Sequence, residues 1–282
     1  MGVRLNDLAT RLLPFGLRVE GHRLVRAFRD RIRRVDLASG RAPASGFAYR
    51  LAESRSPLER VAGALPDELQ RGKEINVALA ARSIDGVVIE PGQLFSYHRL
   101  VGRPSRLRGF RLGLELQDNE EAAGVGGGCC QVSNMLYWLA VNAGLDVVER
   151  HRHGFDLFPD HRRSVPFGCG ATVFYNYRDL RFANPLGVPV RVGLTVVDES
   201  GRADWSARAW TLVGRIDAEA DPGVRVTVEE RGHRFFLEGG VRMRENRIHR
   251  RVVDAGGRVI EDAELAHNLC EVKYDPPEEE RS

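Results

Sequence analysis

The sequence contains no apolar run long enough to cross a bilayer, and its first residues lack the basic, apolar and small-residue order of a secretory signal. Only four of its 282 residues are cysteine, and no two of them form a Cys-x-x-Cys pair. Because such pairs mark zinc ribbons and redox motifs, their absence argues against both classes. We therefore expect a cytoplasmic protein with reduced thiols, attached to a membrane at most peripherally.

Neither sign of charge dominates the sequence. The chain has 42 lysines and arginines against 39 aspartates and glutamates, which gives a formal net charge of +3. Such a small excess gives no reason to expect a nucleic-acid partner. A nucleotide is not expected either, because the triple glycine at 126–128 lacks the lysine and the serine or threonine of a phosphate-binding loop. With 43% hydrophobic residues, the chain can nevertheless bury a full core.

The spacing of apolar residues changes along the chain from helical to strand-like. Apolar side chains recur three and four residues apart in segments 22–34, 73–83 and 130–143, which predicts helices. A tight hairpin is expected over residues 87–97. Alternating segments follow at 171–177, 188–197, 203–213 and 224–230, and then a hairpin that turns at Gly256-Gly257. We predict an α+β fold with a helical N-terminal half, whose cysteine-bearing helix packs on a mostly antiparallel β-sheet formed by the C-terminal half.

Changes of composition divide the chain into four parts. Residues 1–69 form a basic helical and irregular segment, in which 39–57 is rich in Ser, Gly, Ala and Pro and is expected to contain one short strand at 47–51. We expect a core domain at 70–197 and a β-rich extension at 198–275. The acidic end of the chain, 276–282, is expected to be a disordered tail.

The first expected helix, at 22–34, is basic and amphipathic. Leu24, Phe28 and Ile32 share one of its faces, and arginines surround the rest. One interpretation is a helix that docks its apolar stripe on the domain and leaves a basic face in solvent. The other is weak association with an anionic membrane surface.

The stretch from Gly126 to Tyr137 is a glycine run that ends in two cysteines and becomes a helix. A cysteine at a helix N-terminus is favoured as thiolate, because unpaired N–H groups and the helix dipole stabilise negative charge. Cys130 is thus a candidate nucleophile. The preceding glycines leave N–H groups available for an oxyanion. We assign substrate binding to Gly126, Gly127, Gly128, Gln131 and Ser133.

Histidines that follow this helix are candidate bases for the cysteine. A strand over 146–153 would place Glu149, His151 and His153 on one face, so that either His153 or His151 takes the thiol proton. The alternative is that the two cysteines are small core residues. A zinc site made by His-x-His and a cysteine matches no ligand spacing, so neither a metal nor another cofactor is expected.

The stretch from 126 to 137 resembles the signature of the VanW family, which is a triple glycine, one variable residue and Cys-Gln-x-Ser-x-x-Leu-Tyr. Here Cys129 occupies the variable position and Cys130 the family position. The segment from Ser83 to Tyr97 is similar to the family's Asn-Gly, Pro-Gly-x-x-Phe-Ser-Phe segment, and residues 148–153 resemble its Glu-Arg-His-x-His. The likeness extends over about 70–197.

The resemblance implies peptidoglycan L,D-transpeptidation, with Cys130 attacking a stem-peptide carbonyl and His153 acting as base. The family's usual aspartate is replaced by Gly170, so Asp156 or Glu149 would have to orient the histidine. The expected activity is that of a cysteine-dependent acyl transferase or amide hydrolase on a peptide-like, cell-wall-derived small substrate. The alternative is a non-catalytic accessory or binding protein of glycopeptide resistance or cell-wall metabolism.

Overall fold

The computed structural model describes residues 15–32, 35–59, 66–117, 120–152, 155–156, 165–175, 178–200 and 209–272. Within these ranges the chain forms four α-helices and thirteen strands. The helices are α2 (Phe15–Ile32), α3 (Asp67–Ile84), α4 (Tyr97–Val101) and α5 (Cys130–Asn142). The strands are β1 (Tyr49–Pro57), β2 (Val88–Ile89), β3 (Leu94–Ser96), β4 (Leu112–Gln117), β5 (Glu120–Val125), β6 (Asp146–Glu149), β7 (Phe155–Asp156), β8 (Arg181–Ala183), β9 (Val190–Asp198), β10 (Trp210–Ala218), β11 (Val224–Glu238), β12 (Val241–Asp254) and β13 (Val259–Val272).

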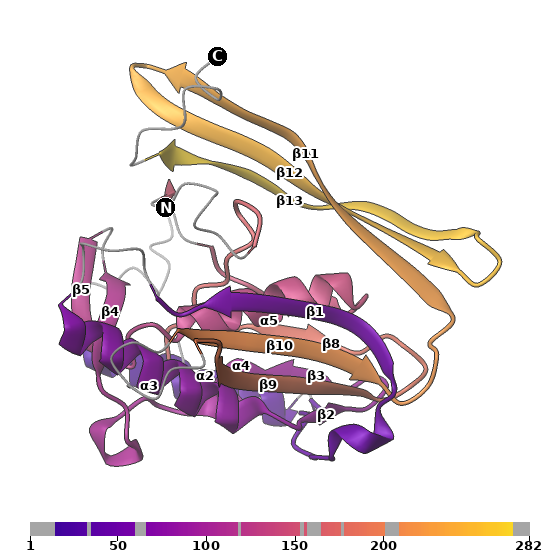
Figure 1. Ribbon diagram of the computed structural model, residues 1–282, viewed down its shortest axis with the longest axis horizontal. Coiled ribbons are helices and arrows are strands. Elements are labelled where there is room, and N and C mark those ends of the chain that lie inside the picture. The colour runs from indigo at the N-terminus through magenta and orange to yellow at the C-terminus, as the bar shows by residue number, and fades with distance from the viewer. Residues whose placement is uncertain are drawn as a thin grey trace, which may run out of the picture.

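The described strands form four sheets, and two of these organise the molecule. The first, called here the core sheet, has the order β1-β10-β9-β2, and all of its neighbours are antiparallel. The second, called here the C-terminal sheet, has the order β11-β12-β13-β7. In Figure 1 the C-terminal sheet lies above α5, α3 and the core sheet. The two smaller sheets are β3-β8-β6 and the hairpin β4-β5.

The expectation of a helical N-terminal half is wrong, because β-structure dominates the chain and β1 to β5 all precede the cysteine helix. The short strand expected at 47–51 is present but extends further, since β1 pairs antiparallel with β10 from Tyr49 to Pro57, through residues expected to be irregular. Its partner lies about 160 residues later in the sequence, so the local composition carried little information about it. The fold is therefore mostly β, with few helices.

The hairpin expected at 87–97 is also absent. Strand β2 pairs with β9 of the core sheet, whereas β3 pairs with β8 of a different sheet. The turn between them does form, and Gly92 adopts a positive φ of 80° there. Its N–H donates to the carbonyl of Asn184 rather than closing a hairpin. The turn thus directs the two short strands apart and delivers α4 to the region of the cysteines.

The helices expected at 73–83 and 130–143 are confirmed as α3 and α5. Five residues of α5 at helical spacing are buried in the core, namely Val132, Met135, Leu136, Leu139 and Ala140. They pack toward β10, where Gly214 leaves room for the Met135 sulfur. Because each buried aliphatic side chain contributes roughly 1.5–3 kcal/mol, this face fixes α5, and with it the cysteines, on the core sheet.

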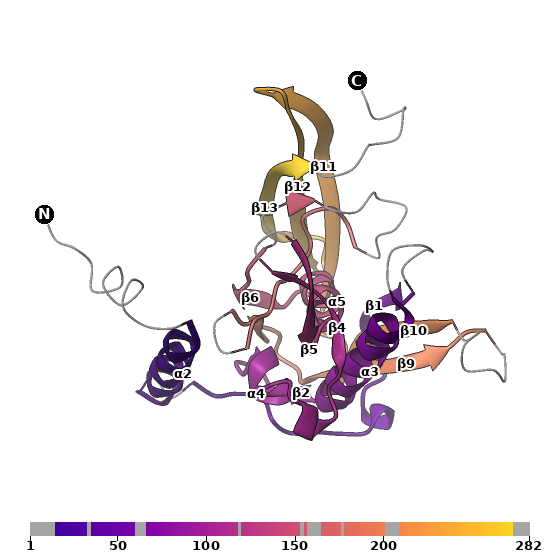
Figure 2. The ribbon, with the colours of Figure 1, turned by 90° about the vertical axis from the view of Figure 1, so that its left-hand side faces the viewer.

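Helix α2 stands at one side of the body in Figure 2 and is attached by ion pairs. Arg26 pairs with Glu149, and Asp30 pairs with Arg181. Its apolar stripe is not docked, since Leu24 is 70% exposed and Phe28 is 65% exposed. The docking interpretation of residues 22–34 is therefore wrong. A search of the described helices finds none whose length and apolar character would let it span a membrane.

The hairpin that turns at Gly256-Gly257 is confirmed as β12–β13. The tail expected at 276–282 lies outside the described residues. The proposed boundaries at residues 69 and 197 remain predictions.

Candidate functional site

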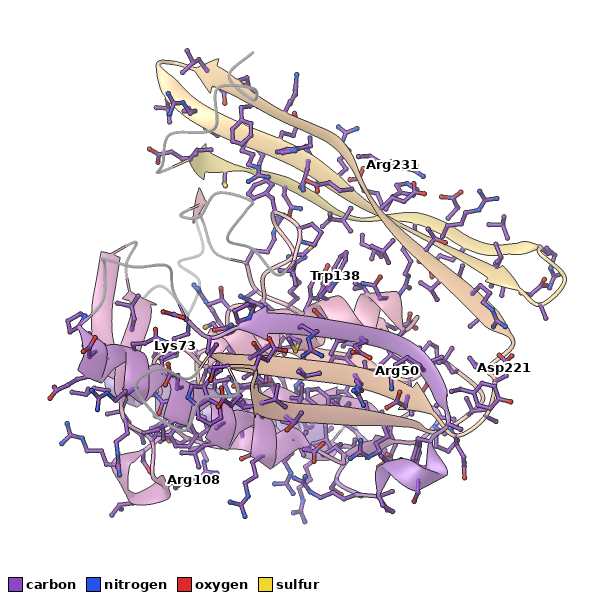
Figure 3. The ribbon with its side chains drawn as sticks, viewed as in Figure 1. Arg50, Lys73, Arg108, Trp138, Asp221 and Arg231 are labelled. Atoms are coloured by element: carbon purple, nitrogen blue, oxygen red, sulfur yellow. The ribbon has the colours of Figure 1, made fainter. Side chains whose placement is uncertain are left out.

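The triple glycine forms the turn between β5 and α5. Gly126 and Gly128 have φ of 93° and 94°, which L side chains rarely adopt. A Cβ on Gly127 would lie 2.1 Å from the carbonyl oxygen of Gly113 in β4, and one on Gly128 would lie 2.4 Å from Cγ of Lys73 in α3 (Figure 3). Close packing therefore requires these glycines, and the packed turn aims the N-terminus of α5.

A buried amide holds the same turn in place. Nδ2 of Asn76 in α3 donates to the carbonyl of Gly127 at 2.9 Å and to the carbonyl of Arg111 at 2.9 Å. Its Oδ1 accepts from the Arg111 N–H at 2.8 Å. Asn76 is wholly buried, so these three bonds satisfy an amide that water does not reach.

The two cysteines of the motif occupy different environments. Cys129 is buried, and its Sγ contacts the carbonyl oxygen of Asn76 at 3.8 Å. Cys130 is the first residue of α5 and is half-buried, with its Sγ 3.9 Å from the carbonyl oxygen of Val173. None of the four cysteines, all of which lie in the described ranges, forms a disulfide. Of the two adjacent thiols, Cys130 is the one that a substrate can reach.

The segment 171–173 is fixed beside Cys130 by the helix itself. The hydroxyl of Ser133 donates to the carbonyl of Ala171 at 2.6 Å, and Asn134 Oδ1 accepts from the Ala171 N–H at 2.7 Å. On its other side the Thr172 N–H donates to the carbonyl of His151 at 2.8 Å. Segment 171–173 thus lies between the start of α5 and the backbone of His151.

His151 is oriented by a carboxylate. Its Nε2 lies 3.1 Å from Oε1 of Glu149, so the protonated nitrogen donates to the carboxylate. Glu149 also accepts two bonds from Arg26, at 2.7 and 2.8 Å, and one from the Asp179 N–H at 3.0 Å. Burial by itself would raise the pKa of Glu149, but the bonds from Arg26, Asp179 and His151 outweigh it and lower that pKa. Glu149 is therefore an anion at neutral pH.

Of the two carboxylates suggested to orient the histidine, Glu149 and Asp156, Glu149 contacts His151. His153 lies outside the described residues, and so does the side chain of Asp156. The role of His153 as base stays a prediction.

Two residues of α4, Tyr97 and His98, were not predicted from the sequence to belong to this region. The hydroxyl of Tyr97 lies 3.4 Å from the carbonyl oxygen of Cys129, and the Tyr97 pKa is raised, first by burial and then by the nearby Cys129 and Cys130. Next to it, Nε2 of His98 donates to the carbonyl of Arg178 at 2.7 Å. Burial lowers the pKa of His98, so this imidazole is neutral. His98 directly follows the segment that resembles the family pattern, which was the available signal.

The other residues assigned to substrate binding have partners within the protein. Nε2 of Gln131 donates to Oγ of Ser56 at 2.7 Å and to the carbonyl of Pro57 at 2.8 Å, and so ties α5 to β1. Ser133 is wholly buried. Gly170, which replaces the family's aspartate, accepts a bond from Nε of Arg150 at 2.9 Å. Substrate binding by Gln131 and Ser133 stays a prediction.

Within the described part of the chain, no group of three or more His, Cys, Asp or Glu side chains is placed to hold a metal ion.

Comparison with known proteins supports the resemblance seen in the sequence. A family model described as VanW like protein matches residues 72–205, which include Cys130 and His151. The chain is 27% identical over 210 residues to the Vancomycin B-type resistance protein VanW of Enterococcus faecalis, covering 74% of this chain and 72% of that protein. It is 34% identical over 125 residues to the Uncharacterized protein YoaR of Bacillus subtilis, covering 43% of this chain and 39% of that protein. No solved structure matches. The resemblance to the VanW family is thereby confirmed over residues 72–205.

Proposed function

We propose that this VanW-like protein is a cysteine-dependent acyl transferase or amide hydrolase that acts on peptidoglycan-related peptides, with Cys130 as nucleophile and His151 as base. One observation supports the proposal: Sγ of Cys130 and the backbone carbonyl of His151 contact the same three-residue segment, 171–173, which brings the two residues to one region. A third group, Glu149, orients the imidazole. Nucleophile, base and orienting carboxylate are the three parts that such chemistry needs.

In the proposed reaction, His151 removes the proton from the Cys130 thiol, and the thiolate attacks a peptide carbonyl carbon. The tetrahedral oxyanion forms beside the N-terminus of α5, where the Gly128 N–H makes no hydrogen bond to another described residue. The intermediate then expels the amine, which takes the proton from the imidazolium, and leaves a thioester on Cys130. An acceptor amine or water releases the acyl group, which gives transfer or hydrolysis respectively. The imidazole must come within hydrogen-bond reach of Sγ in the substrate complex.

The proposed substrate class rests on the resemblance to the VanW family. The relative from Enterococcus faecalis is named a vancomycin resistance protein, and we propose a role for this chain in the same cell-wall context. A cytoplasmic, membrane-peripheral location would restrict it to soluble precursor peptides.

A thioester trap tests the proposal. Purified protein is incubated with an activated thioester of a short acetylated peptide, and the acyl adduct is mapped by mass spectrometry. We expect an adduct on Cys130 that is absent from Cys130→Ala. Cys270→Ala is the matched control, because Cys270 is the other half-buried thiol of the described chain, and it should acylate normally. Labelling of both cysteines at similar rates would contradict a specific nucleophile.

A non-catalytic accessory role is the second candidate, and the packing of the motif favours it. The glycines, Gln131 and Ser133 all have structural contacts that explain their presence without a substrate. This role predicts no adduct on Cys130.

A further inference from the structure

A cavity of about 630 Å³ lies between the VanW-like domain and the C-terminal sheet. One wall comes from the end of α5 and from β6, and the other from β12 and β13. In Figure 1 the C-terminal sheet crosses above α5, and Figure 3 shows Trp138 of α5 on the side of the helix that faces it. The volume falls within the range of small-molecule sites, roughly 300–1,000 Å³. We infer that this cavity binds a short aliphatic peptide or peptide-like molecule through its carboxylate.

Three arginines line the cavity, and one of them is neutralised. Arg250 pairs with Glu261 at 2.7 Å and with Asp146 at 3.4 Å, and it also donates to the carbonyl of Leu145 at 2.8 Å. Its charge and most of its donors are thus occupied within the protein.

Among the residues that the structure describes, the partners of Arg150 are all neutral. Its guanidinium lies over the ring of Tyr137, 3.9 Å from the centroid, and Nη1 donates to the Tyr137 hydroxyl at 2.9 Å. Its other bonds go to the carbonyls of Gly170 and Gly168. These contacts fix the orientation of the guanidinium but supply no negative charge.

Arg152 likewise bonds only to neutral groups among the described residues. Its Nη1 donates to the carbonyl of His267 at 2.6 Å and to Oδ1 of Asn268 at 2.8 Å, while Nε and Nη2 make no bond to another described residue. No carboxylate of the described chain forms an ion pair with Arg150 or Arg152. Among the described residues, neither of these two cationic groups has a counterion, and Arg152 has three N–H donors that bond to none of them.

The proximity of the two positive charges on Arg150 and Arg152 is unfavourable unless an anion neutralises them. Burial lowers the pKa of Arg150, and the positive charge of Arg152 lowers it further, despite the favourable fields of Tyr137 and Cys169. A planar carboxylate matches the guanidinium fork and can accept two parallel bonds from it. The rest of the lining includes Val141, Val147, Leu265 and Ala266, which suit an aliphatic side chain.

This inference is independent of the proposed cysteine chemistry. Tyr137 lies seven residues beyond Cys130 on α5, which is about 10 Å along the helix. Binding to the cavity is measured without turnover, so it can succeed or fail whatever Cys130 does.

Isothermal titration with a matched pair of ligands tests the inference. The probes are N-acetyl-alanyl-valine, its C-terminal amide and inorganic phosphate, each added to the full chain at low salt. We expect saturable binding of the acid that is at least about tenfold tighter than binding of the amide, as a lost charge-assisted hydrogen bond predicts. Equal binding of acid and amide, binding of phosphate alone, or no binding of any probe would overturn the inference.

Variants then locate the site. Arg152→Gln should weaken binding of the acid about tenfold, because its charge is lost while an amide donor remains. Arg251→Gln removes a positive charge from an exposed position on the same β12, outside the cavity, and should leave the affinity unchanged. An equal loss in both variants would show non-specific attraction and would also overturn the inference.

Discussion

His151 donates a hydrogen bond to Glu149 across 3.1 Å, and Arg26 of α2 holds the same carboxylate with two further bonds. Helix α2 is in this way connected to the candidate base of the cysteine. Removal of the carboxylate charge should therefore affect reactions of Cys130 without touching the thiol.

Glu149→Gln keeps an oxygen that can accept from His151 but loses the negative charge that stabilises the imidazolium. We expect the rate of Cys130 acylation to fall about 10- to 100-fold, since general-base catalysis contributes on the order of 10²–10⁴-fold. The matched control is Glu245→Gln, because Glu245 makes an equivalent bond to His267 at 2.6 Å on the C-terminal sheet. Equal rates in the two variants would remove His151 from the mechanism.

His98 makes stability depend on pH. Burial lowers its pKa, and the field of Arg26 adds to this, while Asp179 and the backbone carbonyls of Arg178 and Phe174 oppose it. The unfolded chain therefore binds the proton more readily. The stability that His98 contributes is present above its unfolded pKa, 6.5, and is lost as pH falls through the lower folded pKa.

Urea unfolding measured at about pH 7.5 and about pH 5.5 would show this loss in the wild type. In His98→Gln the amide can still donate to the carbonyl of Arg178, so we expect a smaller loss across the same interval. Glu149 does not confound this test, because its stabilisation disappears only below its ordinary pKa of 4.5. The same pH dependence in both proteins would exclude His98 as its source.

Asn76→Ala should destabilise the fold by about 3 kcal/mol, because it removes three hydrogen bonds and leaves the Gly127 carbonyl and the Arg111 N–H without their side-chain partner, although the Arg111 carbonyl still accepts from the Gly126 N–H. The control is Asn142→Ala at the end of α5. Asn142 is half-buried and donates only to the carbonyl of Trp138, so we expect a loss within about 1 kcal/mol. Chemical unfolding gives both values, and comparable losses would show that the glycine turn does not depend on the amide.

Helix α2 should bind anionic vesicles weakly, with an affinity that falls as salt rises, because its apolar stripe is exposed beside arginines. Phe28→Ser should reduce the fraction bound in vesicle sedimentation. Leu237→Ser is the control, since Leu237 is 72% exposed on β11 and lies far from α2 in the sequence. Absence of binding at low salt would contradict a membrane role for residues 22–34.

The sequence predicted those features that local periodicity determines. The apolar spacing of Val132, Met135 and Leu136 identified α5, and the paired glycines at 256–257 identified the last hairpin. Only the start of strand β1 was predicted, as a short strand at 47–51, because its partner, β10, is distant in sequence. The divergence of β2 and β3 was missed for the same reason, since β9 and β8 decide it.

The candidate site was predictable to a similar degree. The position of Cys130 at a helix N-terminus followed from the motif. Its contact with Val173 did not, because that contact depends on bonds from Ser133 and Asn134 to Ala171. Arg26 was likewise unpredictable as a partner of Glu149, because 123 residues separate them.

The rate of Cys130 alkylation by iodoacetamide as a function of pH tests the central claim most directly. Peptide mapping follows the reaction, and Cys130→Ala gives the contribution of the adjacent Cys129. We predict a thiol pKa below the ordinary value of about 8.5 in the wild type and a higher one in His151→Gln. His267→Gln, the matched histidine control, should behave as the wild type. An ordinary pKa for Cys130 that does not change in His151→Gln would contradict the account.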